Sequence, residues 1–174
     1  MIAGKKSNLR SIENEDSALY HRWINDAETN YWRGLYHPTN LEDAKDYIRA
    51  QSHHTPDKLT LGIESFEKTL VGLIGLRGIC SRSRRAEIWI YLGDKQVWGR
   101  GLGSDAVYTL CEYAFNEMNL HRLWLECEPE NIGAVKCYEK CGFVIEGRCR
   151  DGYFRHGRYR DTITMALLSS DWKK

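Results

Sequence analysis

The sequence lacks long hydrophobic runs, an excess of charge of either sign and any repeated or low-complexity segment. Its 174 residues include only three prolines and four phenylalanines, and 25 basic against 24 acidic side chains leave a formal charge of +1. No apolar run approaches the roughly 20 residues that cross a membrane, and the first residues lack the apolar stretch of a signal peptide. A near-neutral chain also has no global positive charge for binding nucleic acid non-specifically. We therefore expect a cytoplasmic protein that binds neither membranes nor nucleic acid.

What is present is an ordinary globular composition, with 42% hydrophobic and 28% charged residues. A chain of this length can bury a sizeable core as one unit, so we expect a single domain over residues 1–174. The six cysteines are scattered through apparent core elements, which favours reduced thiols. Cys137 and Cys141 lie one helical turn apart, but no second pair at that spacing completes the four ligands of a zinc site. We expect no metal.

The hydrophobic pattern predicts an α/β fold of the α+β type, with a mixed and mostly antiparallel sheet of about seven strands flanked by about four helices. Three successive strands with short breaks indicate an antiparallel meander. The expected strands are 8–12, 59–65, 70–77, 86–92, 122–127 and two around 152–157, and the expected helices are 13–25, 40–51, 102–119 and 132–141. In the helix from Leu102, apolar residues recur at three- and four-residue steps, and the polar face includes Asp105 and Thr109.

The most informative segment is the glycine turn from Gln96 to Gly103, between a predicted strand and a predicted helix. Three glycines at alternate positions let backbone amides converge on an anion at the positive end of the helix. The spacing Gly99-x-Gly101-x-Gly103 does not match the dinucleotide fingerprint, and the Lys-Ser/Thr ending of a Walker loop is absent. A plain connection between a strand and a helix remains an alternative.

A second segment, Asn131 to Phe143, follows about thirty residues later. It predicts a short helix that ends at Gly142, where glycine favours the left-handed backbone. Asn131 and Tyr138 are seven residues apart, which places both on one side of this helix.

Together these segments resemble the acetyl-CoA motifs of the GNAT acyltransferase superfamily, and the likeness covers about residues 8 to 168. The branch that it most resembles contains ribosomal-protein alanine and spermidine acetyltransferases, through Arg84-Arg85-Ala86-Glu87, Asn131, Tyr138 to Phe143 and Glu146-Gly147. The resemblance implies that the fourth and fifth strands, 86–92 and 122–127, splay apart in a V and admit the pantetheine arm of acetyl-CoA. It implies pantetheine contacts from Ile90, Tyr91, Leu92 and Asn131, and pyrophosphate contacts from Trp98, Gly99, Arg100, Gly101, Leu102, Gly103 and Ser104.

The same resemblance makes Tyr138 the candidate acid for the departing CoA sulfur, since a phenol of pKa about 10 is protonated at neutral pH. A surface tyrosine used for packing is the alternative. An acceptor amine must also lose a proton, and Glu87 is the candidate base because strand alternation directs Glu87, Trp89 and Tyr91 to one face. A glutamate paired with Arg84 or Arg85 is equally compatible with the sequence, and Glu126, Glu128 or a chain of waters could serve instead.

The acceptor stays open at this stage. The reaction that we expect is direct acetyl transfer to a primary amine, such as a protein N-terminus, an amino sugar or another small amine. Acetylation of a polyamine such as spermidine or spermine is the alternative, although the acids that a polyamine requires are missing from Arg33-Gly34-Leu35 and Gly75-Leu76-Arg77-Gly78. Tyr31, Trp32 and Tyr36 are candidates for lining the acceptor pocket, and a homodimer is compatible with the sequence. A non-catalytic module that senses acyl-CoA is the alternative from another class.

Five arginines occupy the last two strands, and they favour a solvated face over a phosphate site. Their expected counter-charges are Glu146, Asp151 and Asp161. These arginines are Arg148, Arg150, Arg155, Arg158 and Arg160.

Overall fold

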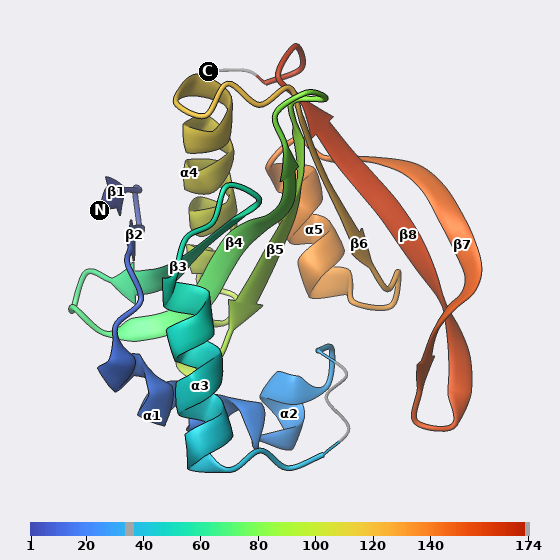
Figure 1. The fold of residues 1–174 in the computed structure, drawn as a ribbon. Coiled ribbons are helices and arrows are strands. Elements are labelled where there is room, and N and C mark those ends of the chain that lie inside the picture. The colour runs from blue at the N-terminus through green and yellow to red at the C-terminus, as the bar shows by residue number, and fades with distance from the viewer. Residues whose placement is uncertain (34–36, 173–174) are drawn as a thin grey trace.

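A single open sheet with helices on both faces is formed by residues 1–33 and 37–172, which the computed structural model describes (Figure 1). The strands lie in the order β1-β2-β3-β4-β5-β6-β8-β7. Every neighbouring pair is antiparallel except β5 and β6, which are parallel. The predicted fold class is confirmed, and the described residues add one short strand and one short helix to the expected set.

The strands are β1 (Ile2–Ala3), β2 (Ser7–Arg10), β3 (Lys58–Ser65), β4 (Leu70–Cys80), β5 (Arg85–Leu92), β6 (Arg122–Cys127), β7 (Val144–Arg155) and β8 (Arg158–Leu168). The helices are α1 (Ser17–Ile24), α2 (Ala27–Asn30), α3 (Leu41–Ser52), α4 (Leu102–Asn116) and α5 (Ile132–Lys140), with 3₁₀ turns at Asn14–Asp16 and Lys95–Val97. The predicted meander is β3, β4 and β5. Within the described residues, no helix combines the length and apolar character needed to cross a bilayer.

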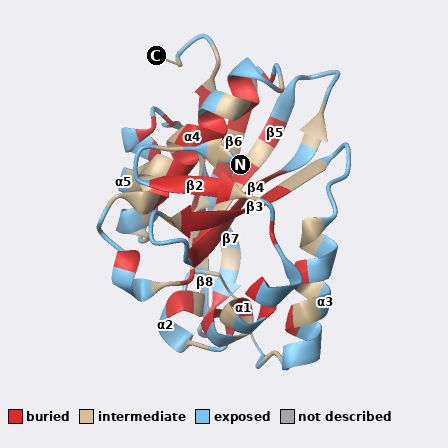
Figure 2. Ribbon diagram, turned by 90° about the vertical axis from the view of Figure 1, so that its left-hand side faces the viewer, coloured by how far each residue is buried: buried red, intermediate tan, exposed pale blue. Residues whose placement is uncertain are grey.

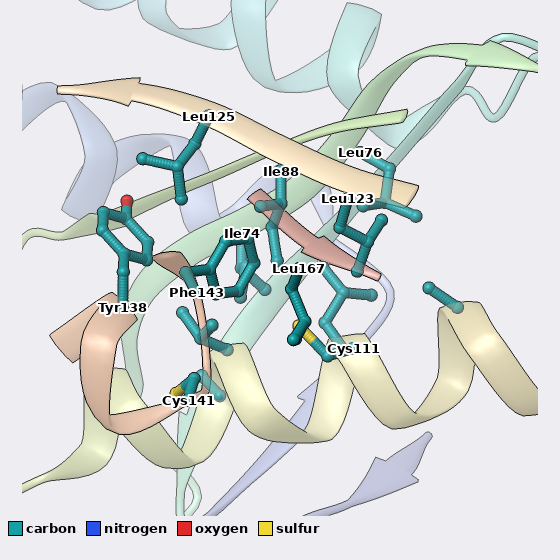
Figure 3. Packing of buried hydrophobic residues seen from close by; sticks show 14 of the residues in the cluster. Ile74, Leu76, Ile88, Cys111, Leu123, Leu125, Tyr138, Cys141, Phe143 and Leu167 are labelled. Atoms are coloured by element: carbon teal, nitrogen blue, oxygen red, sulfur yellow. The ribbon is translucent and has the colours of Figure 1, made fainter. Parts of the chain in front are cut away.

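Helix α4 packs on one face of the sheet through the predicted apolar stripe. Ala106, Val107, Leu110 and Ala114 are fully buried, and they meet residues of β4, β5 and β6 in the larger core cluster. Figure 3 shows Cys111 of α4 in this cluster with Ile88 and Leu123 of the sheet. The expected polar face is not wholly solvated, because Thr109 is buried. Strands β1 and β2 contact α4 there and cover that side of the helix.

The opposite face of the sheet carries α1 and α3. A second cluster joins Tyr20 and Trp23 of α1 and Ile48 of α3 to Leu73 of β4 and Tyr91 of β5. Figure 2 shows the buried residues gathered in the central strands and on the inner sides of the helices, whereas β7 is largely exposed. The sheet therefore separates two cores, and successive residues of β5 face different ones.

The predicted V between β5 and β6 is present. Their parallel pairing consists of three residue pairs, from Arg85 opposite Arg122 to Glu87 opposite Trp124. Beyond Glu87 the two strands diverge, and β6 continues in register with β8 as far as Cys127 (Figure 1). The last two strands are longer than predicted and meet at a tight turn in which His156 and Gly157 both have positive φ.

Candidate functional site

The glycine turn ahead of α4 leaves several backbone amides without partners. The amides of Trp98 and Arg100 are used, since they donate to carbonyls of the preceding 3₁₀ turn at 3.2 and 3.3 Å. The first amide bonded in the helical pattern belongs to Asp105, which donates to the Gly101 carbonyl at 3.0 Å. The amides of residues 102 to 104 therefore have no partner in the helix, and together with the helix dipole they favour the binding of an anion at this end of α4.

Two of the glycines are required by geometry. Gly101 precedes the helix with φ at +84°, a conformation that glycine adopts without strain. A side chain on Gly103 would begin 3.1 Å from Leu92 Cδ1, so its absence lets α4 approach β5 closely. Of the seven residues predicted for the anion, the free amides are those of Gly99, Gly101, Leu102, Gly103 and Ser104.

Lys6 also reaches this turn, and the sequence did not single it out. Asp105, in the first turn of α4, accepts hydrogen bonds from the amides of Lys5 and Lys6 at 3.0 and 2.9 Å, and from the amide and hydroxyl of Ser7 at 2.9 and 3.0 Å. This clamp brings Lys6 Nζ to 3.0 Å from the Arg100 carbonyl. Among the described carboxylates, none forms an ion pair with Lys6. The sequence held one local indication of this clamp, because Asp105 is an acidic residue in the helix turn at which an anion is expected to bind.

The backbone of β5 alternates between its two neighbours. In an antiparallel pair, every second residue exchanges both of its hydrogen bonds with the partner strand. The Gly93 amide donates to the Val71 carbonyl of β4 at 3.0 Å, and this fixes the alternation. Residues 87, 89 and 91 therefore direct their backbone polar groups at β4, and residues 88, 90 and 92 direct theirs at β6.

Past the last β6 pair, the polar groups of Ile90 and Leu92 consequently face the space between the diverging strands. Trp98 Nε1 donates a hydrogen bond to the Leu92 carbonyl at 3.1 Å. Both polar groups of Ile90 and the Leu92 amide remain for a ligand that adds as an extended strand. Tyr91 does not face the space in which its predicted pantetheine contact would form, because its backbone pairs with Leu73 of β4 and its ring lies in the second core cluster.

Helix α5 presents Asn131 and Tyr138 beside this space. Asn131 is the N-cap residue, and its Oδ1 accepts from the Ala134 amide at 3.2 Å, so its amide nitrogen is the group left for a ligand. Tyr138 is 6% exposed and packs against Phe143 at 5.8 Å between ring centres, with its hydroxyl directed away from α4 (Figure 3). Burial raises the pKa of Tyr138 above its ordinary value, so the phenol is protonated at neutral pH.

Glu87 lies on the face of β5 that carries Trp89 and Tyr91, opposite Ala86 and Ile88 of the larger cluster. Its partner is Arg77 of β4, rather than Arg84 or Arg85, and Arg77 bonds Oε1. That hydrogen bond raises the pKa of Arg77.

Two further acids follow on β6 and just beyond it. Glu126 is exposed, two residues after Trp124, on the same side of the sheet as Glu87. Glu128 is buried and bonded by Arg155, and burial raises its pKa against the opposing effect of that guanidinium. Arg155 thus engages one candidate base, whereas Glu126 stays available.

The expectation of a solvated arginine face is wrong for Arg155, which is buried. It is 3% exposed, donates to the Tyr31 carbonyl and stacks over the rings of Tyr31 and Trp32 at 4.3 and 4.5 Å. The end of the β7–β8 hairpin is therefore tied to the aromatic segment after α2. Of the expected counter-charges, Asp161 pairs with Arg148, but Glu146 pairs with Arg122 of β6. Gly34, Leu35 and Tyr36 lie outside the described residues.

The six cysteines range from buried, at Cys111 and Cys141, to exposed, at Cys149. All six are free, and among the described residues no group of three or more His, Cys, Asp or Glu side chains gathers as a metal site would require. Cys137 lies next to the turn, where Ser104 Oγ donates to its sulfur at 3.4 Å. The neighbouring Cys141 thiol and Ser104 hydroxyl lower the pKa of Cys137.

Comparison with known proteins gives one family. The model of the acetyltransferase (GNAT) domain matches residues 7–144. A spermidine N(1)-acetyltransferase of Vibrio cholerae is 30% identical over 165 residues, which cover 94% of each chain. A proposed ribosomal N-acetyltransferase of Bacillus subtilis is 31% identical over 115 residues, 64% of this chain and 62% of that protein. The crystal structure of the Vibrio cholerae spermidine N-acetyltransferase with CoA and spermine superposes with a TM-score of 0.85 at 28% identity, covering 95% of this chain and 97% of that one.

Proposed function

The chain belongs to the GNAT acetyltransferase family and is an acetyl-CoA-dependent N-acetyltransferase, and we propose that it moves the acetyl group directly to a small primary amine. The observation that carries the proposed binding mode is the unpaired Ile90 backbone and Leu92 amide in the V between β5 and β6, which leads to the free amides ahead of α4. When bound, acetyl-CoA supplies an activated acetyl thioester.

Backbone and side-chain groups of the protein would bind acetyl-CoA along the V between β5 and β6 and at the turn ahead of α4. Ile90, Leu92 and the Asn131 side-chain amide would bond the pantetheine amides in place of a missing strand. The amides of Gly99 and of residues 101–104 would receive the pyrophosphate, where Arg100 and Lys6 add positive charge. Both cations are without carboxylate partners among the described residues, so neither must break an ion pair to bind phosphate.

Two side chains would handle the protons. Glu87 Oε2, the oxygen that Arg77 does not bond, would accept the proton of the acceptor's ammonium directly or through water. The Tyr138 hydroxyl would donate to the sulfur as the thiolate leaves, since burial keeps the phenol protonated. Glu126 is the second candidate for the base.

Transfer to a polyamine is the second candidate function. It is favoured by the relatives named as spermidine N(1)-acetyltransferases, one of which aligns over 94% of this chain. The described part of the predicted acceptor segment is basic, with Arg33 after Tyr31 and Trp32. A panel of primary amines that includes spermidine, measured by CoA release, decides between the two candidates. Acetyl-CoA that stabilises the fold without acetylation of any amine would instead indicate a binding module.

Lys6→Ala is expected to raise the Kd for acetyl-CoA about five- to tenfold, since a hydrogen bond to a charged group at an exposed site contributes roughly 1–1.5 kcal/mol. The loss should shrink as salt rises, because exposed charges are screened. Calorimetric titration at two ionic strengths measures both effects, with Lys45→Ala on α3 as the matched control. Equal Kd values for Lys6→Ala and the wild type would remove Lys6 from the site.

A further inference from the structure

Arg33 lies in a cage of three tyrosine rings. Its guanidinium carbon is 5.1 Å from the ring centre of Tyr20 on α1, 5.4 Å from that of Tyr47 on α3 and 4.8 Å from that of Tyr91 on β5. Tyr20 and Tyr47 stack at 4.7 Å, and Arg33 Nη2 donates to the Tyr20 hydroxyl at 2.7 Å. The ring faces hold the cation in place through cation–π attraction.

The charge of Arg33 is not balanced by the described part of the chain. Arg77 and Arg155 each pair with a glutamate, whereas Arg33 forms no ion pair with a described carboxylate. Arg33 Nη1 and the Tyr91 hydroxyl are both buried, and neither makes a hydrogen bond of good geometry, although Arg33 and Thr29 lie close enough to the Tyr91 hydroxyl to lower its pKa against the larger effect of burial. Burial raises the pKa of both Tyr20 and Tyr91, so these two rings stay neutral. An unmatched buried donor on a cation is unfavourable, and it indicates that a ligand supplies the acceptor.

The cage lies on the acceptor side of the sheet. Tyr91 stands on β5 beyond the point where β6 diverges, on the same strand face as Glu87. The unmatched guanidinium and the candidate base therefore lie on the same side of the sheet, opposite the face that packs on α4.

We propose that Arg33 binds a carboxylate of the acceptor, which makes the substrate class a primary amine that carries a carboxylate, such as an amino acid. The planar guanidinium offers Nη1, and the Tyr91 hydroxyl is the second donor beside it. An acceptor with a second ammonium in place of the carboxylate meets an unpaired like charge. Arg33 is thus a specificity residue, and this inference rests on the proposed acetyl transfer to amines.

Matched amines that differ only in the carboxylate test the inference. Lysine and cadaverine form one pair and tryptophan and tryptamine another, with spermidine as the polycation. For wild-type protein, kcat/KM is expected to be about tenfold to a hundredfold higher for the carboxylate member of at least one pair, the effect of one hydrogen bond to a charged group. Arg33→Gln should abolish that ratio, and Arg33→Lys, which keeps the charge but not the planar donors, should retain part of it.

Arg49→Gln, which removes an exposed arginine on α3, is the matched control and should leave the ratio unchanged. Thermal unfolding and acetyl-CoA affinity of each Arg33 variant show whether the fold survives the substitution. Calorimetric binding of lysine and cadaverine to CoA-saturated protein gives a readout that does not need turnover. There too, the wild type should prefer lysine and Arg33→Gln should not.

The two hypotheses fail in different ways. Acetylation of amines with no advantage for either carboxylate member, or with an advantage that Arg33→Gln leaves intact, overturns the role of Arg33 and leaves acetyl transfer standing. Loss of stability in Arg33→Gln with an unchanged substrate ratio also overturns it, because the cage then serves only to pack α1 against β5. Absence of acetylation across the whole panel overturns the proposed acetyl transfer itself.

Discussion

Tyr138→Phe is expected to lower kcat by about 10²- to 10⁴-fold, the usual contribution of a positioned acid, and to leave the Kd for acetyl-CoA nearly unchanged. The substitution removes only the hydroxyl, and the ring still packs against Phe143. Because burial raises the pKa of the phenol, the wild-type group is protonated over the whole neutral range. In the variant, the leaving thiolate would lack the donor that we propose. Steady-state kinetics together with calorimetry separate the two effects.

Tyr113→Phe on α4 is the control for this substitution, since it makes the same chemical change in a partly buried ring at the core's edge. It should retain wild-type kcat. If Tyr138→Phe also retained it, the buried ring would be a packing residue, which was the alternative that the sequence left open. A raised Kd with unchanged kcat would place the hydroxyl in substrate binding instead of proton transfer.

The fold could be predicted from the sequence where local pattern and tertiary packing agree. The stripe of Ala106, Val107, Leu110 and Ala114 has helical period, and the structure buries all four. The meander β3–β4–β5 was predictable because each strand is rich in branched apolar residues with short breaks. Thr109 was misplaced on a polar face, since nothing local shows that the N-terminal strands cover that side of α4.

The features of the candidate site were predictable to the extent that they belong to motifs of adjacent residues. The glycine turn and Asn131 could be identified from the sequence, because backbone conformation and helix capping are local properties. Which backbone groups are free depends on pairing between strands, and this alternation sets Ile90 and Leu92 apart from Tyr91. Lys6 reaches the turn through a clamp 99 residues away in sequence, and such a contact leaves no trace in local composition.

The surroundings of the arginines in the last two strands also depend on contacts that are distant in sequence. Arg155 differs from Arg148 only in what it meets, and that depends on where the β7–β8 hairpin ends relative to α2. Arg148 is exposed beside Asp161, whereas Arg155 is enclosed by Glu128, Tyr31 and Trp32. Charge patterning predicts the first environment and cannot predict the second.

Glu128→Ala is expected to reduce the free energy of unfolding by about 3–5 kcal/mol, because it leaves Arg155 as a buried charge without its carboxylate. Urea or thermal unfolding of the two proteins at neutral pH measures this loss. Arg49→Ala, which removes an exposed pair with Asp46 on α3, should leave the free energy nearly unchanged.

The double variant Glu128→Leu with Arg155→Met separates the cost of leaving one ion unpaired from the net contribution of the ion pair to stability. Apolar side chains of similar volume avoid the cost of desolvating two ions, so the double variant should regain most of the lost stability. It also removes the guanidinium that bonds the Tyr31 carbonyl and stacks over Trp32. If that link positions the acceptor segment, the double variant will be stable and bind acetyl-CoA as the wild type does, yet show a raised KM for the amine. An unchanged KM would mean that the pair only joins the hairpin to α2, and a single-variant loss below about 1 kcal/mol would mean that water reaches the pair.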